Sequence, residues 1–199
     1  MTEHYYSKNP KTESRPLHWD YTLRGKTFRF TTDRGVFSKN EVDFGSKLLI
    51  HTFHEPVASG PFLDIGCGYG PIGLALAKTY PMRTVHMIDV NERAIRLAEE
   101  NARNNQIENV TIYESDGFER VKETTFAAIV TNPPIRAGKN IVFHLLEKSK
   151  EYLCPEGELW VVVQKKQGAP SVKTKLSEIF GNVTVVKRDK GYYIFRAQK

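Results

Sequence analysis

The sequence predicts an α/β fold in which a largely parallel sheet carries helices on both faces. From residue 62 onward, short apolar runs alternate with segments whose apolar residues recur at helical spacing. A glycine-rich loop follows the first of these runs, and the last two runs are separated only by residues 188–191. A parallel return needs a crossover of about a dozen residues, so the closing pair is predicted to be antiparallel.

Length and composition fit one well-buried domain. The chain has 199 residues, of which 40% are hydrophobic and 26% are charged, close to the average for soluble domains. Its longest apolar runs are about five residues, far below the ~20 needed to span a bilayer, and no signal pattern opens the chain. Cys67 and Cys154 form no paired metal spacing, which suits a reducing cytosol. We therefore expect a cytoplasmic protein.

The first part of the chain is predicted as a tail and hairpin over 1–34, ahead of a main domain over 35–199. The alternation over 19–31 about Arg24-Gly25-Lys26 predicts the hairpin. Trp19 and Tyr21 either pack the hairpin or offer a stacking platform to RNA, and packing is favoured. Helical spacing over 40–54 ends at Pro56 and predicts a helix.

The main domain is predicted to alternate strands with helices. Asn91 is the expected cap of one helix, because its side chain can accept backbone N–H groups. The predicted strands are 62–65, 84–88, 110–113, 127–130, 157–164, 183–187 and 192–196. The predicted helices are 71–78, 91–104, 140–152 and 171–180.

The glycine loop fits the dinucleotide fingerprint as written. Gly68, Gly70 and Gly73 form G-x-G-x-x-G after a strand, and Asp89 follows about twenty residues on. Asp64 argues against NAD, because a carboxylate near the loop would repel a pyrophosphate. S-adenosylmethionine carries a sulfonium and an ammonium instead, and a carboxylate favours both. Asp89 is placed to accept hydrogen bonds from ribose hydroxyls with either cofactor.

A second motif, Thr131-Asn132-Pro133-Pro134-Ile135, follows the strand predicted over 127–130. The side-chain oxygen of Asn132 and the carbonyl of Pro133 are suited to accept the two hydrogens of an exocyclic amine. That arrangement would aim the amine nitrogen at a methyl donor, with Asn132 and Pro133 as the catalytic residues. The alternative is an ordinary turn that ends a strand.

The glycine loop carries a resemblance to a known family. Leu63-Asp-Ile-Gly-Cys-Gly-Tyr-Gly70 resembles the first motif of class I S-adenosylmethionine-dependent methyltransferases, and Met87-Ile-Asp-Val-Asn91 resembles the second. The resemblance covers roughly 35–199 and implies a seven-stranded sheet of order 3-2-1-4-5-7-6 with strand 7 antiparallel. It also places Asp116 near the adenine, although a turn former before Gly117 fits equally. The expected cofactor-binding residues are Phe37, Asp64, Gly66, Gly68, Gly70, Asp89, Asp116, Gly117 and Asn132.

The segments 35–38, 43–46 and 132–139 most resemble small-subunit ribosomal RNA guanine-N2 methyltransferases of the small-domain type. The chain departs from them in lacking room for the second domain of longer members. It also has Ile135 where many amino methyltransferases have an aromatic that stacks on the base; Phe37 is an alternative stacking partner, a cofactor cover or a core aromatic. The rivals are a protein-glutamine or small-molecule amine methyltransferase and a catalytically silent RNA-binding module.

The net charge of +6 is unevenly distributed: 1–40 carry +4, 41–138 carry −4 and 139–199 carry +6. A basic periphery fits an RNA partner or a merely solvated surface, and charge alone does not decide. Four cations near the predicted catalytic edge are the candidate phosphate contacts: Arg136, Lys139, Lys165 and Lys166. His51 and His54 are expected to be surface histidines with no metal, and Cys67 a small filler. The sequence leaves the oligomeric state open, with a monomer favoured.

Overall fold

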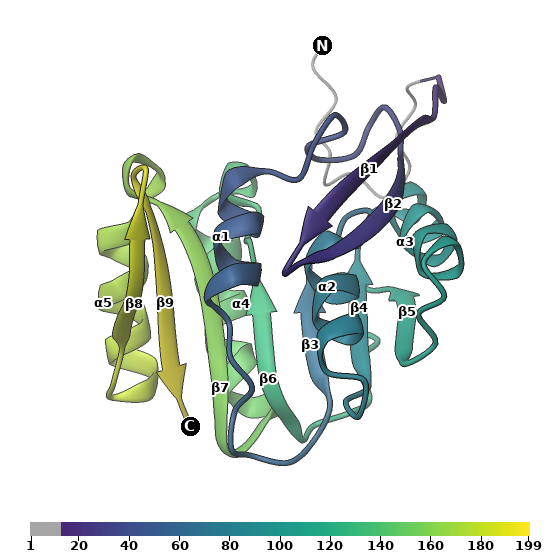
Figure 1. The fold of residues 1–199 in the computed structure, drawn as a ribbon. Helices are drawn as coiled ribbons and strands as arrows, with labels where there is room; N and C mark the ends of the chain where they lie inside the picture. The colour runs from purple at the N-terminus through teal and green to yellow at the C-terminus, as the bar shows by residue number, and fades with distance from the viewer. Residues whose placement is uncertain (1–12) are drawn as a thin grey trace.

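The computed structural model describes residues 13–199, which form a seven-stranded sheet flanked by helices and a separate two-stranded hairpin (Figure 1). The strands are β1 (Leu17–Leu23), β2 (Lys26–Thr32), β3 (Phe62–Ile65), β4 (Val85–Asp89), β5 (Val110–Glu114), β6 (Phe126–Thr131), β7 (Leu153–Gln164), β8 (Thr184–Asp189) and β9 (Tyr192–Gln198). The helices are α1 (Phe44–Thr52), α2 (Pro71–Thr79), α3 (Glu92–Asn104), α4 (Lys139–Tyr152) and α5 (Ala169–Phe180), with short 3₁₀ turns η1 (Ile135–Ala137) and η2 (Lys165–Gln167).

The large sheet has the order β5-β4-β3-β6-β7-β9-β8, with β9 antiparallel to both neighbours and the other pairs parallel. This confirms the predicted order and the antiparallel closing pair. The strand β7 begins earlier than the predicted 157, because the chain passes from α4 directly into it. The pairing then jumps from Phe126↔Leu153 to Ala128↔Glu158, and Glu156 adopts a positive φ of 62° at this bulge.

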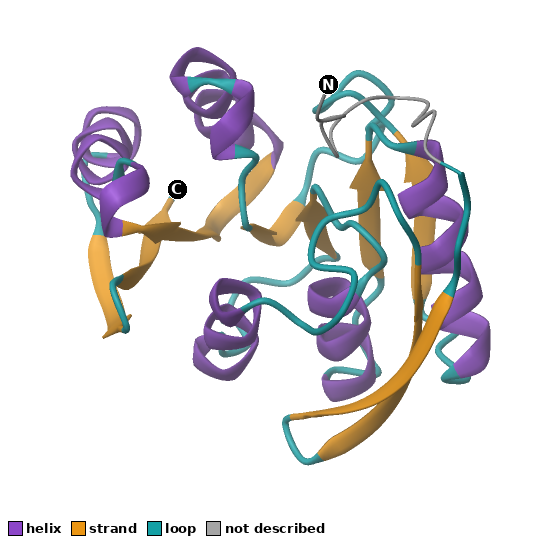
Figure 2. Ribbon diagram, turned by 90° about the horizontal axis from the view of Figure 1, so that it is seen from above, coloured by secondary structure: helices purple, strands orange, loops and turns teal. Residues whose placement is uncertain are grey.

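Helices cover both faces of the sheet (Figure 2). One apolar core lies between the sheet and α1, α2 and α3, and the other lies between the sheet and α4 and α5. The central strand β6 is buried at every residue, which explains its continuous apolar sequence with no alternation. Asn91 caps α3 as predicted, its side chain accepting the N–H groups of Arg93 and Ala94.

The β1–β2 hairpin shares the core of α1, α2 and α3. Phe28 and Phe30 are buried in this core, and the ring of Trp19 lies 5.3 Å from that of Phe30 and 5.9 Å from that of Tyr69. The indole N–H of Trp19 also donates to Thr32 Oγ1 at 3.2 Å. The predicted packing role of Trp19 is therefore the one observed.

The fold brings the ends of the parallel strands to one edge of the sheet. The glycine loop follows β3, and Asp89 ends β4. Asn132 follows β6, and Gln164 ends β7. Ligands of such sheets bind at this edge. Within 13–199, no helix is long and apolar enough to cross a membrane, and no group of three or more His, Cys, Asp or Glu side chains has an arrangement that could hold a metal ion. His51 and His54 are exposed, as predicted.

Candidate functional site

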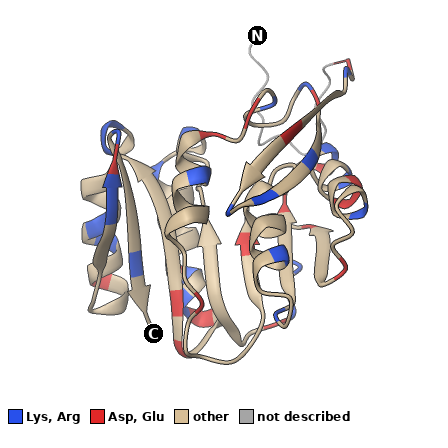
Figure 3. Ribbon diagram, viewed as in Figure 1, with Lys and Arg blue, Asp and Glu red and all other residues tan. Residues whose placement is uncertain are grey.

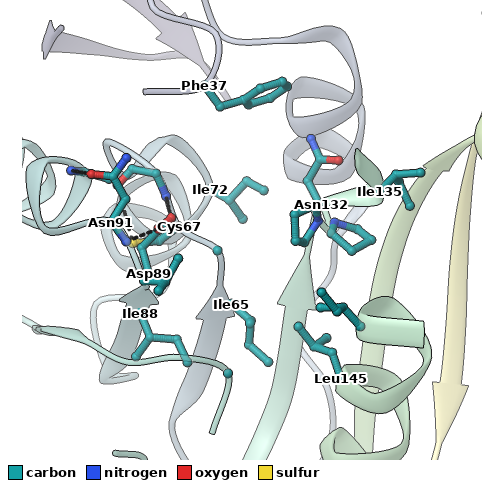
Figure 4. Close-up of a pocket in the computed structure, with 18 of the residues that line it drawn as sticks. Phe37, Ile65, Cys67, Ile72, Ile88, Asp89, Asn91, Asn132, Ile135 and Leu145 are labelled. Atoms are coloured by element: carbon teal, nitrogen blue, oxygen red, sulfur yellow. Dashed lines mark hydrogen bonds between the residues drawn. The ribbon is translucent and has the colours of Figure 1, made fainter. Parts of the chain in front are cut away.

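A pocket of about 1040 Å³ opens at this edge, and both predicted motifs line it. Asp89 and Asn132 lie on opposite sides of the pocket, with Phe37 above the space between them (Figure 4). Phe37 is 42% exposed, so it is not a core aromatic. Several other predicted residues line the same pocket: Gly66, Gly68, Asp116, Gly117, Pro133 and Arg136.

The loop between β3 and α2 and the first turn of α2 require glycine for two different reasons. Gly66 and Gly68 have φ of 73° and 57°, a left-handed backbone that other residues seldom adopt. At Gly73 the reason is space, because an added Cβ would lie 2.6 Å from Met87 Cγ. The first two glycines thus turn the backbone beside the pocket, and the third lets α2 pack closely on β4.

Both carboxylate oxygens of Asp89 accept backbone hydrogen bonds. Its Oδ2 accepts the N–H of Gly68 at 2.9 Å, and its Oδ1 accepts the N–H of Asn91 at 2.9 Å. Burial raises the pKa of Asp89, while these backbone hydrogen bonds lower it. A carboxylate offers about four acceptor positions, so Asp89 retains capacity to accept a hydrogen bond from a ligand hydroxyl.

Asp64 and Gly70 do not line the pocket, which differs from the cofactor contact expected of them. The Asp64 side chain is fully buried, and its Oδ2 accepts the N–H of Gly73 at 2.8 Å. Its Oδ1 has no hydrogen-bond partner among the described residues. Burial, with a further contribution from the charge of Asp89, raises the pKa of Asp64 to about 7 despite the hydrogen bond from Gly73.

This arrangement leaves few donors for a phosphate at the start of α2. Pro71 has no N–H, the N–H of Gly73 is used by Asp64, and that of Leu74 donates to the Gly70 carbonyl. Anion sites at helix N-termini depend on free N–H groups. Asp64 thus occupies a helix donor beneath the loop and does not face the pocket, so the predicted direct repulsion of a pyrophosphate is replaced by the loss of an N–H donor.

Asp64→Asn is expected to stabilise the protein above neutral pH. The pKa of Asp64 is about 7 in the folded state and has an ordinary value of 3.8. Between these two values the folded state holds a proton that the unfolded state releases, so the free energy of unfolding falls as the pH rises. Asparagine keeps an acceptor for Gly73 but leaves a buried N–H₂ unpaired, so we expect a net gain of roughly 1–3 kcal/mol at about pH 8. Urea unfolding from about pH 4 to about pH 8 measures this. A wild-type stability that does not fall across the window, or an equal fall in the variant, would contradict it.

Two neighbours fix the orientation of the Asn132 amide. Its Nδ2 donates to Asp43 Oδ1 at 3.2 Å and to Ser46 Oγ at 3.1 Å. The Asp43 carboxylate also caps α1, its Oδ1 accepting the N–H groups of Gly45 and Ser46. Because a carboxylate only accepts hydrogen bonds, the N–H₂ of Asn132 must face Asp43. The amide oxygen of Asn132 therefore faces away from Asp43 and has no donor among the described residues.

The two prolines form a tight turn after Asn132. The Pro133 carbonyl accepts the N–H of Ile135 at 2.8 Å, and Pro134 has φ −74° and ψ 77°, the geometry of an inverse γ-turn. One lone pair of the Pro133 oxygen is thus used within the chain and one remains. Pro133 is buried and lines the pocket beside Asn132.

The four predicted cations lie on the two loops expected at this edge. Arg136 lines the pocket, whereas Lys139 places its Nζ 5.0 Å from the centre of the Phe143 ring. Lys165 and Lys166 are exposed in η2, between Gln164 and Gln167, which line the pocket. The neighbouring strands β6 and β7 therefore bring these cations to the same edge, and their contact with phosphate stays a prediction.

Sequence reasoning gave Asp43 and Ser46 no role and did not single out Tyr192. Asp43 lies inside the segment predicted as a helix over 40–54, and nothing in the sequence links it to Asn132. Tyr192 comes from the far end of the chain and lines the pocket, with its Cε1 2.9 Å from the position of an added Cβ at Gly45. Cys67 is buried and its pKa is raised by that burial, in line with a filler.

A family model for the methyltransferase small domain matches residues 27–196. The chain belongs to this methyltransferase family. The methyltransferase is 59% identical over 200 residues to Uncharacterized protein YbxB of Bacillus subtilis, and the match covers all of both chains. It is 34% identical over 169 residues to Ribosomal RNA small subunit methyltransferase C of Vibrio cholerae, which is 83% of this chain and 48% of that one.

Solved structures show the same fold. The methyltransferase superposes on the 16S rRNA N2 methyltransferase RsmC of T. thermophilus, in complex with AdoMet and guanosine, with a TM-score of 0.83 and 25% identity. That match covers 96% of this chain and 52% of the other. A methyltransferase from Pyrococcus furiosus shares the fold with a TM-score of 0.67 and 23% identity, over 83% of this chain and 89% of that one. The methyltransferase thus spans about half the length of the Vibrio and Thermus relatives.

Proposed function

We propose that this methyltransferase transfers a methyl group from S-adenosylmethionine to an exocyclic amine, namely N2 of a guanine in small-subunit ribosomal RNA. The observation that carries the proposal is the Asn132 amide, whose N–H₂ is held by Asp43 and Ser46. The oxygen is thereby available to a group that donates hydrogen bonds, and an exocyclic amine is such a group. The names of the Vibrio and Thermus relatives support ribosomal RNA as the source of the amine.

The residues on the Asp89 side of the pocket fit S-adenosylmethionine. The remaining acceptor capacity of Asp89 suits the ribose hydroxyls, and the exposed Asp116 lines the same pocket, where it is available to a polar adenine edge. Ile88, Val90 and Phe118 offer apolar surface for the ring. The few free donors at the start of α2 suit a cofactor that lacks phosphate. When bound, S-adenosylmethionine supplies a methyl group already activated by its sulfonium.

The residues on the Asn132 side then have a positioning task. Asn132 Oδ1 and the remaining lone pair of the Pro133 carbonyl accept the two hydrogens of the amine. These bonds turn the nitrogen lone pair toward the methyl group and favour the positive charge that develops on nitrogen. The stiff turn at Pro134 holds the second acceptor in place. Phe37 stands at the opening, where it covers the cofactor or stacks on the base.

Methyl transfer from radiolabelled S-adenosylmethionine tests the proposal. Total RNA, isolated small ribosomal subunits, a protein extract and simple amines are offered separately, and labelled RNA is digested to nucleosides. We expect label in N2-methylguanosine. Label confined to protein or to small amines would replace the RNA assignment by one of its rivals. No transfer to any acceptor, with S-adenosylmethionine still bound, would indicate a silent binding module.

Asp89→Ala is expected to weaken S-adenosylmethionine binding by roughly 1–3 kcal/mol, the value of lost hydrogen bonds to a charged acceptor. Calorimetry on the wild type should show one site per chain for S-adenosylmethionine and no measurable NADH binding. Because Asp89 also accepts the N–H groups of Gly68 and Asn91, Asp89→Asn is the conservative control and should lose less. Tight NADH binding would contradict the cofactor assignment.

A further inference from the structure

The polar groups around Asn132 form a chain of hydrogen bonds that begins at the start of α1. Asp43 Oδ1 accepts the backbone N–H of Gly45 at 2.9 Å and of Ser46 at 3.1 Å, and Asn132 Nδ2 lies 3.2 Å from the same oxygen. Asp43 Oδ2 is 3.4 Å from Asn132 Nδ2. Ser46, on the first turn of α1, takes the other Asn132 hydrogen at 3.1 Å. Both amide hydrogens are thus used by the start of α1.

The carboxylate is the decisive member of this group. A serine hydroxyl can donate or accept, so Ser46 would tolerate either orientation of the Asn132 amide. Asp43, when ionised, tolerates only the orientation in which the N–H₂ faces it. The helix cap by itself does not require a carboxylate, because asparagine caps helices equally well. The choice of Asp over Asn at residue 43 therefore bears on the orientation of Asn132, beyond its role as the cap of α1.

We propose that Asp43 is a positioning residue that holds the Asn132 amide with its oxygen toward the acceptor and so restricts the acceptor to groups that donate a hydrogen bond. This inference rests on the proposed function. Asp43 lies 89 residues before Asn132 in sequence, and α1 and the end of β6 bring the two together. An amide in the opposite orientation would present N–H₂ to the amine and repel it.

Exchanging the side chains of Asp43 and Asn132 tests whether Asp43 fixes the orientation of the Asn132 amide, which we call the lock. In Asp43→Asn, the carbonyl oxygen stays on the Gly45 and Ser46 N–H groups, and the new N–H₂ takes the place of Oδ2, 3.4 Å from Asn132 Nδ2. Two N–H₂ groups then face each other, so residue 43 no longer holds the Asn132 amide in a single orientation. We expect turnover to fall about tenfold or more, with S-adenosylmethionine affinity and melting temperature nearly unchanged. Asn132→Asp sets two carboxylates against each other and should also be slow. Ser46→Ala should lose less turnover than either variant, because Asp43 still selects the orientation of the Asn132 amide.

The double variant Asp43→Asn with Asn132→Asp gives the deciding readout. Here the amide introduced at residue 43 donates to one oxygen of the carboxylate introduced at residue 132, whose other oxygen faces the acceptor again. We expect turnover to recover about tenfold above Asn132→Asp, a recovery that a merely structural role of Asp43 does not produce. A double variant no faster than Asn132→Asp, or an Asp43→Asn variant with wild-type turnover, would overturn the lock alone. A wild type that labels no exocyclic amine would overturn the proposed function and the restriction together.

Discussion

Asn132→Ala is expected to slow methyl transfer by at least about a hundredfold while changing S-adenosylmethionine affinity much less. The variant removes the oxygen that accepts an amine hydrogen, and it leaves the Asp89 side of the pocket intact. Loss of the amide also frees Asp43 and Ser46, which then meet water in place of Nδ2. Single-turnover rates and calorimetry on the same preparation separate the two effects.

A matched control is Asn104→Ala, which removes an exposed amide at the end of α3 away from the pocket. We expect this control to turn over like the wild type. Normal turnover in Asn132→Ala would leave the alternative standing, namely that Thr131-Asn132-Pro133-Pro134 is an ordinary turn at the end of β6. An equal loss of cofactor affinity and turnover would place Asn132 in cofactor binding rather than at the acceptor.

The sequence was sufficient for the sheet because its elements repeat with clear boundaries. Alternating apolar runs and helical periods predicted the strands, and the short segment 188–191 required the antiparallel closing pair that β8 and β9 form. The η1 and η2 turns were not predicted, since three residues give no period. The early start of β7 was missed because Pro155 and the positive φ of Glu156 interrupt the pattern.

The sequence predicted many of the residues that line the site, but only part of how they are arranged. In β3 every residue is buried, so alternation carries no information about which way Asp64 points, and its place beneath the glycine loop had to come from the structure. The partnership of Asp43 with Asn132 was equally out of reach. It depends on how α1 packs on β7 and the start of β9, which brings Asp43 beside the residue that follows β6. No local pattern encodes such a tertiary contact.

The salt dependence of substrate binding tests whether RNA is the partner. Figure 3 shows Lys and Arg along β8 and around the loops at the upper end of the sheet. Arg136, Lys165 and Lys166 are exposed in the 3₁₀ turns that follow β6 and β7, and Lys139 is exposed at the first residue of α4. If they contact phosphates, substrate affinity should fall with rising salt through counterion release, with a log–log slope of roughly −0.7 per contact on a single strand. Replacing all four with glutamine should flatten that slope by as much as about 3 and weaken RNA binding strongly at low salt.

Three further readouts make this prediction specific. S-adenosylmethionine affinity should stay nearly unchanged, and the methylated base should remain the same, because phosphate contacts position RNA without reading its sequence. The charge-matched control replaces four exposed cations that do not line the pocket, Arg96, Arg103, Lys122 and Lys173. This control lowers the net charge equally, so a similar loss of slope in both variants would assign the effect to overall charge. Protein and small-amine substrates have no phosphate backbone, so their binding should depend little on salt. If binding of the true substrate proves insensitive to salt, RNA is not the partner, and the methyltransferase fold is unaffected by that outcome.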